Sequence, residues 1–196
     1  MSNPGRDALV AMLSRLKSDL HALNLSKPEV ARAQIQAKYP LTGDYLVEVR
    51  RLWQRGIDEG WLGDSDSGGP GGMRLTASTK YFPFSIDALM LHGSGHAHRH
   101  PKGEISLSWQ VDSYARYCDE EPGWAVCAPG SKHAPRAKGG PVFVLTFLPG
   151  GKVEWDAKSK KALEKPAARR STGLAAASRA ASAANRASGS RRASAR

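Results

Sequence analysis

Cysteine is scarce in this sequence, which contains only Cys118 and Cys127 among 196 residues. Two cysteines are too few for a disulfide framework, and no Cys-x-x-Cys pair suggests a redox or zinc motif. Long apolar runs are also missing, since no stretch approaches the roughly 20 residues that a membrane-spanning helix requires. The N-terminus is amphipathic, unlike a secretory signal. We therefore expect a soluble, cytoplasmic protein with no membrane partner.

The end of the chain has one acidic residue and no aromatic residue. Residues 160–196 contain ten Lys and Arg against a single acid, Glu164, and therefore carry +9 of the total net charge of +11. This segment consists almost wholly of Ala, Ser, Arg, Lys and Gly, which cannot bury enough apolar area to offset the entropy of ordering. We predict a disordered basic tail over residues 159–196.

Two roles are open for the basic tail. Its charge permits weak nucleic-acid binding, which would be insensitive to sequence because no aromatic side chain is present for base stacking. The alternative is a solubilising extension without a partner.

Residues 1–62 are predicted to form an N-terminal helical segment. Apolar residues recur at spacings of three and four, which places them on one face of each helix. The spacing predicts helices over residues 4–24, from a capping box at Ser26 to about Tyr39, and over 44–60. The residues expected to be buried in the first and last helix are Leu9, Met12, Leu13, Leu16, Leu20, Leu23, Leu46, Val49, Trp53 and Ile57.

The pattern changes after a glycine-rich linker, which we place at residues 63–73. Residues 74–158 contain short apolar or alternating segments separated by Gly, Pro, Asp and Ser, which is typical of a sandwich or barrel. The predicted fold class is therefore mainly β, with one small barrel domain following the helical segment.

Five of the six histidines lie between His92 and His133, and His96, His98 and His100 alternate along one segment. Alternate side chains of a strand share a face, so two imidazoles of a His-x-His pair can reach one ion. Glu104 follows a Pro-Lys-Gly turn that can return its carboxylate toward the histidines. Imidazole and carboxylate ligands suit a divalent iron, manganese, nickel, zinc or cobalt ion. The alternative is an exposed histidine-rich loop that binds no metal.

A second block, GWAVCAPGSKHAP, contains a glycine, an apolar segment, a Pro-Gly turn and His133. The two blocks together resemble the paired motifs of the cupin superfamily, although Pro129 and Gly130 are adjacent and Ala137 occupies the usual asparagine position. The resemblance implies a cupin-type β-barrel with the metal ligands His98, His100, Glu104 and His133. It also implies open coordination positions, as in catalytic rather than structural sites.

Most of residues 1–156 resembles the 4-hydroxylaminobenzoate lyase family, through HRHPKGE, PGSKH and a final LPGG before Glu154. The resemblance implies conversion of 4-hydroxylaminobenzoate and water to 3,4-dihydroxybenzoate and ammonia, as in nitroaromatic catabolism. Glu104 and His96 are then the candidate catalytic residues, with His96 either an acid–base group or a polar residue at the barrel mouth. Alternatives are a cupin oxygenase or isomerase on another small aromatic, or a non-catalytic cupin that binds a small ligand.

A benzoate substrate requires a cation for its carboxylate. The candidates are Arg74, Lys80, Arg116 and Arg136, among which the sequence does not choose. Arg99 alternates with the histidines and is expected to face away from them. Cys127 lies in an apolar segment and is expected to pack in the core. A homo-oligomer is possible.

Overall fold

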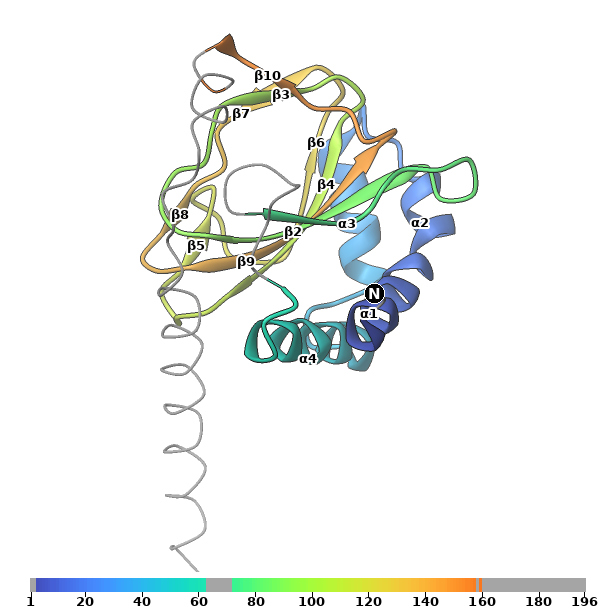
Figure 1. The fold of residues 1–196 in the computed structure, drawn as a ribbon. Coiled ribbons are helices and arrows are strands. Elements are labelled where there is room, and N and C mark those ends of the chain that lie inside the picture. Colours follow the sequence, from blue (N-terminus) through green and yellow to red (C-terminus); the bar gives the residue numbers. More distant parts are fainter. Residues whose placement is uncertain (1–2, 63–71, 158, 160–196) are drawn as a thin grey trace, which may run out of the picture.

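The computed structural model describes residues 3–62, 72–157 and 159. The described residues form four helices followed by ten strands (Figure 1). The helices are α1 (Pro4–Ser14), α2 (Lys17–Ala22), α3 (Pro28–Lys38) and α4 (Asp44–Asp58). The described part is mainly β with a helical N-terminal segment, which confirms the predicted fold class.

The strands form three antiparallel sheets. The largest contains β1 (Gly72–Thr76), β2 (Phe84–Leu91), β9 (Val142–Pro149), β4 (Glu104–Gln110) and β6 (Trp124–Cys127), in that order. A second sheet contains β10 (Glu154–Trp155), β3 (His98–His100) and β7 (Ser131–His133), and a third contains β5 (Arg116–Tyr117) and β8 (Ala137–Lys138). The sheets formed by the described residues do not close into a complete barrel.

The two faces of the large sheet differ because side chains alternate along each strand. One face packs against the helices and contributes Ile86, Ile105, Leu107, Trp109, Phe143, Leu145 and Phe147 to the main core. Figure 1 shows all four helices on this side. The opposite face carries Asp87, Leu89, Glu104, Thr146 and Leu148, which line a cavity. The helices thus cover the outer face and leave the inner face for the site.

The helical segment differs from its prediction in two places. The helix expected over residues 4–24 is divided into α1 and α2, although the buried stripe continues across the break through Leu13, Leu16 and Leu20. The capping box at Ser26 is not formed, because α3 begins at Pro28 after Lys27 and has no side-chain cap. Proline fixes the backbone of the first helical residue by itself.

Helix α4 buries the side that its spacing predicted, including Val49, Trp53 and Ile57. The Trp53 ring packs on Trp109 and Phe143 of the large sheet, with ring centroids 6.1 and 5.7 Å away. These aromatic contacts attach the helical layer to the back of the site.

Two predicted segments lie largely outside the described residues, namely most of the linker over 63–73 and the tail over 159–196. Strand β1 begins at Gly72, two residues before the predicted start of the β region. No described helix is long and apolar enough to cross a bilayer.

Candidate metal centre

Three histidines converge from two neighbouring strands of the three-stranded sheet. His98 and His100 come from β3, and His133 comes from β7. The antiparallel register places His98 directly opposite His133 and His100 opposite Ser131. The His133 Nε2 atom lies 3.2 Å from Nε2 of His98 and 3.0 Å from Nε2 of His100. The cluster is therefore a product of strand pairing.

Glu104 reaches the histidines from the large sheet, because a turn follows His100. Gly103 in this turn has φ +86°, and a Cβ atom there would lie 2.8 Å from the Cys127 carbonyl oxygen, so a side chain is excluded. The turn places the Glu104 Oε2 atom 2.6 Å from Nε2 of His100 and 3.7 Å from Nε2 of His133. The site thus lies between the two sheets.

The four side chains offer donor atoms that all lie within 4.8 Å of one another. The Nδ1–H of His98 donates a hydrogen bond to the His96 carbonyl at 2.7 Å. In a neutral ring this leaves the lone pair of Nε2 available to bind a metal ion. Donor atoms bound about 2.1 Å from a single ion lie roughly 3.0–3.4 Å apart, close to the spacing of these nitrogens. Three imidazoles and one carboxylate therefore fit a divalent transition-metal ion.

Burial and mutual contacts shift the protonation of this cluster. Burial lowers the pKa of His98. Burial also acts to lower the pKa of His133, but hydrogen bonds with Cys118 and Glu104 outweigh it and raise that pKa to about 9. Burial acts to raise the pKa of Glu104, but hydrogen bonds with His100 and His133 prevail and hold it well below its ordinary range. Glu104 is therefore anionic, which favours cation binding.

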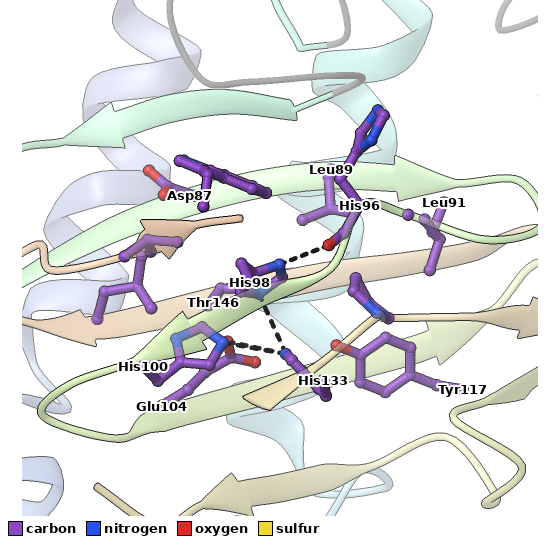
Figure 2. A pocket seen from close by; sticks show the side chains of 15 residues that line it. Asp87, Leu89, Leu91, His96, His98, His100, Glu104, Tyr117, His133 and Thr146 are labelled. Atoms are coloured by element: carbon purple, nitrogen blue, oxygen red, sulfur yellow. Dashed lines mark hydrogen bonds and ion pairs between the residues drawn. The ribbon is translucent and has the colours of Figure 1, made fainter. Parts of the chain in front are cut away.

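The cluster lies in a cavity of about 90 Å³. Its apolar walls include Leu89, Leu91, Pro135, Leu148, Val153 and Trp155. Figure 2 shows the four ligand side chains gathered at one part of this cavity. A largely apolar cavity with a few convergent polar groups is the usual form of a small-molecule site.

His96 lines the cavity, but its ring is not gathered with the other imidazoles. Figure 2 shows it turned away from them, while its carbonyl accepts the hydrogen bond from His98. The expected shared face does not form, because β3 begins only at His98 and the preceding residues are not in a strand. In this conformation the His96 backbone is what contacts a ligand.

None of the four candidate cations for a substrate carboxylate lines the cavity. Arg74 forms a bidentate pair with Asp87 at 2.7 and 3.0 Å, and Asp87 does line it. The other candidates contact surface groups elsewhere: Arg116 pairs with Glu121, Arg136 with Asp119, and Lys80 lies over the Tyr81 ring. Arg74 is thus the candidate connected to the cavity wall, and Arg99 pairs with Glu154.

Three cavity or ligand contacts were not anticipated from the sequence. Tyr117 is 6% exposed and lines the cavity. The Cys118 side chain lies near His133 and contributes to the raised pKa of that histidine. Trp155 packs on the His98 ring with centroids 4.8 Å apart. Tyr117 and Trp155 lie in strands of two residues, which are too short to give a periodic signal in the sequence. Ser106 also contacts Glu104, and its position two residues along the same strand could have been recognised from the alternation.

The chain matches a family model described as 4-hydroxylaminobenzoate lyase over residues 21–155. A 4-hydroxylaminobenzoate lyase of Pseudomonas putida is 29% identical over 153 residues, covering 66% of this chain and 87% of the relative. A 4-hydroxylaminobenzoate lyase of Nocardioides sp. (strain LMS-CY) is 26% identical over 164 residues, covering 76% of this chain and 92% of the relative.

Solved structures with a likeness to the chain include two bacterial proteins. One is an uncharacterized conserved protein with a double-stranded β-helix domain from Klebsiella pneumoniae, with TM-score 0.37 and 19% identity, covering 50% of this chain and 92% of that one. The other is a cupin-like protein from Thermotoga maritima, with TM-score 0.35 and 14% identity, covering 53% and 93%.

Proposed function

Because the chain belongs to the 4-hydroxylaminobenzoate lyase family, we propose that it is a metal-dependent lyase that converts 4-hydroxylaminobenzoate to 3,4-dihydroxybenzoate and ammonia. The proposed metal dependence is supported by one observation, the convergence of four side chains in a small, largely apolar cavity. They are His98, His100, Glu104 and His133. We propose that these four side chains hold one divalent ion.

The overall reaction consumes one water. The N–O bond of the hydroxylamine breaks and its oxygen leaves as water, a second water adds to the neighbouring ring carbon, and a third hydrolyses the imine to release ammonia. A bound divalent ion supplies Lewis acidity for charge that develops on the departing oxygen. No external oxidant or reductant is required, because the N–O bond is reduced while the ring carbon is oxidised.

The protein's own groups bind and orient the substrate in this proposal. Leu89, Leu148 and Trp155 provide apolar surface for the aromatic ring. Glu104 and the three histidines hold the ion at one part of the cavity. Arg74 is the candidate cation nearest in contact to the cavity, through its pair with Asp87, and it would reach a substrate carboxylate only if that pair opened.

The test is ammonia release from 4-hydroxylaminobenzoate under nitrogen by metal-loaded protein. We expect stoichiometric ammonia and dihydroxybenzoate without oxygen or nicotinamide. Glu104→Gln keeps the shape but removes the charge that attracts the ion, so it should lose both metal and activity, whereas exposed His21→Ala should retain both. Absence of ammonia, with oxygen uptake on a catechol-like substrate, would instead support a cupin oxygenase.

His96→Ala separates two roles for that residue. The variant keeps the backbone carbonyl that orients His98, so it should keep the metal. A rate loss of about 10²–10⁴-fold is expected for a missing general acid–base group. Such a loss would assign a proton-transfer role to the His96 ring. A loss below about tenfold would show that only the His96 carbonyl, which orients His98, contributes to the site.

A further inference from the structure

The cavity face of β4 carries a run of polar residues next to the ligand Glu104. Ser106 and Ser108 follow it at alternate positions, and both are 1% exposed. The Ser106 hydroxyl donates to the Glu104 Oε1 atom. Ser108 instead contacts the backbone of Gly123, whose N–H donates to its hydroxyl at 3.1 Å. Two serines with equal burial on one strand therefore have different partners, and only Ser106 contacts a ligand.

Tyr117 extends this contact away from the ligands. Tyr117 lies beside the Ser106 side chain, close enough for the two hydroxyls to interact. A serine hydroxyl has one proton, and Ser106 gives it to Glu104, so in any hydrogen bond between the two hydroxyls Tyr117 is the donor. Figure 2 shows the Tyr117 hydroxyl directed toward the ligand cluster. Tyr117, Ser106 and Glu104 thus follow one another in a chain of neighbouring polar groups.

This chain gives the two oxygens of Glu104 different surroundings. Oε1 accepts from Ser106, while Oε2 lies 2.6 Å from the His100 Nε2 atom. A carboxylate can bind a cation through one oxygen or both. With Oε1 engaged by Ser106, only Oε2 is directed at the space between the histidines.

We propose that Ser106, supported by Tyr117, is a positioning residue that restricts Glu104 to offering one oxygen to a bound ion. The proposal rests on the metal-binding part of the proposed function. Its consequence for the reaction is that a coordination position stays free for the substrate. Without the serine hydroxyl, the carboxylate is free to turn and offer both oxygens, which would occupy that position.

The experiment uses the full chain, stripped of metal and reloaded with Co²⁺, whose visible absorption depends on coordination number. Ser106→Ala is compared with the matched control Ser108→Ala and with the wild type. We expect Ser106→Ala to bind Co²⁺ but to show altered intensity of the visible bands, as expected for a higher coordination number. Its kcat/KM for 4-hydroxylaminobenzoate should fall by about 10–100-fold, the usual effect of losing a hydrogen bond to a metal ligand. The control should keep the wild-type spectrum.

Tyr117→Phe is the second variant, because it leaves the Ser106–Glu104 contact in place. We expect Tyr117→Phe to shift the Co²⁺ spectrum in the same direction as Ser106→Ala, by a smaller amount. If Ser106→Ala melts at a much lower temperature than the control, the spectrum of Tyr117→Phe tests the positioning role in its place, and an unchanged spectrum would then overturn it. Spectra and kinetics of Ser106→Ala that equal those of Ser108→Ala would overturn the positioning role alone. Wild-type protein that binds no Co²⁺ would overturn the metal site and this proposal together.

Discussion

The backbone N–H of Gly130 donates a hydrogen bond to the carbonyl of His100 at 2.8 Å. The same carbonyl accepts from Gly103 at 3.1 Å. The turn before Glu104 and the turn before His133 are therefore attached to one backbone atom of a third ligand residue. This junction fixes the two ligand-bearing blocks of the sequence relative to each other, so the ligand geometry depends on backbone contacts as well as on the ligands.

Metal analysis is the most direct test of the ligand set. Purified protein should contain close to one divalent ion per chain, measured by inductively coupled plasma mass spectrometry. His98→Ala and His133→Ala should lose this ion, because each removes one of the converging nitrogens. His21→Ala, on an exposed part of α2, should retain it. Equal metal content in all three variants would contradict the assignment.

Metal affinity should depend on pH in a defined direction. In the metal-free protein, burial acts to lower the pKa of His133, but its contacts with Cys118 and Glu104 raise it to about 9. His133 is then protonated at pH 7, whereas a metal ligand must be neutral. Binding should therefore release about one proton, and affinity should rise about tenfold per pH unit up to about pH 9. Calorimetry in buffers of different ionisation enthalpy measures this release, and an affinity that is flat from pH 7 to 9 would count against it.

Trp155 should affect substrate binding more than folding. Its ring packs on His98 and lines the cavity, where it is placed to contact an aromatic substrate. An aromatic contact contributes about 0.5–1.5 kcal/mol, so Trp155→Ala should raise KM by roughly two- to tenfold, and Trp155→Phe should recover most of it. Tyr114→Ala, which removes an aromatic ring that is 81% exposed, is the control for a general loss of aromatic surface.

Removal of the basic tail should leave the fold intact if the cut spares Ser159. The Ser159 hydroxyl donates to the Ala97 carbonyl at 2.9 Å, beside the ligand strand β3. A chain ending at Ser159 should melt within about 2 °C of the full chain, a change below roughly 1 kcal/mol. A chain ending at Asp156 should melt lower, because this contact is lost.

If the full chain binds nucleic acid through its tail, the chain that ends at Ser159 should not bind it. Moderate salt should also abolish the binding, because it would depend on counterion release. Gel-shift measurements at two salt concentrations check this. Retention that survives both changes would place the binding surface on the folded part of the chain.

The residue types of the candidate site could be predicted from the sequence because their spacing is local. His98 and His100 alternate on one strand, and the Pro-Lys-Gly turn allows Glu104 to return beside them. The buried faces of the helices were predictable for the same reason, since spacings of three and four define a helix face. The break between α1 and α2 was not predictable, because the apolar stripe continues through it.

His96 shows where the local argument fails. Alternation places it with His98 only if the segment is extended, and the strand begins at His98, two residues too late for that. The cations show a second failure, since Arg74, Arg116 and Arg136 are equivalent by charge. Only the pairing of β1 with β2, which brings Arg74 opposite Asp87, connects one of them to the cavity wall.

The sequence by itself predicted the kinds of candidate ligand, their order along the chain and the apolar stripes that cover the sheet, because these follow from spacing within single helices and strands. Tertiary structure alone decided that His133 lies opposite His98, and that Tyr117 contacts Ser106 beside Glu104. These contacts join residues far apart in the chain. Their geometry is set by sheet register and by the packing of two sheets, and neither is encoded in the spacing of neighbouring residues.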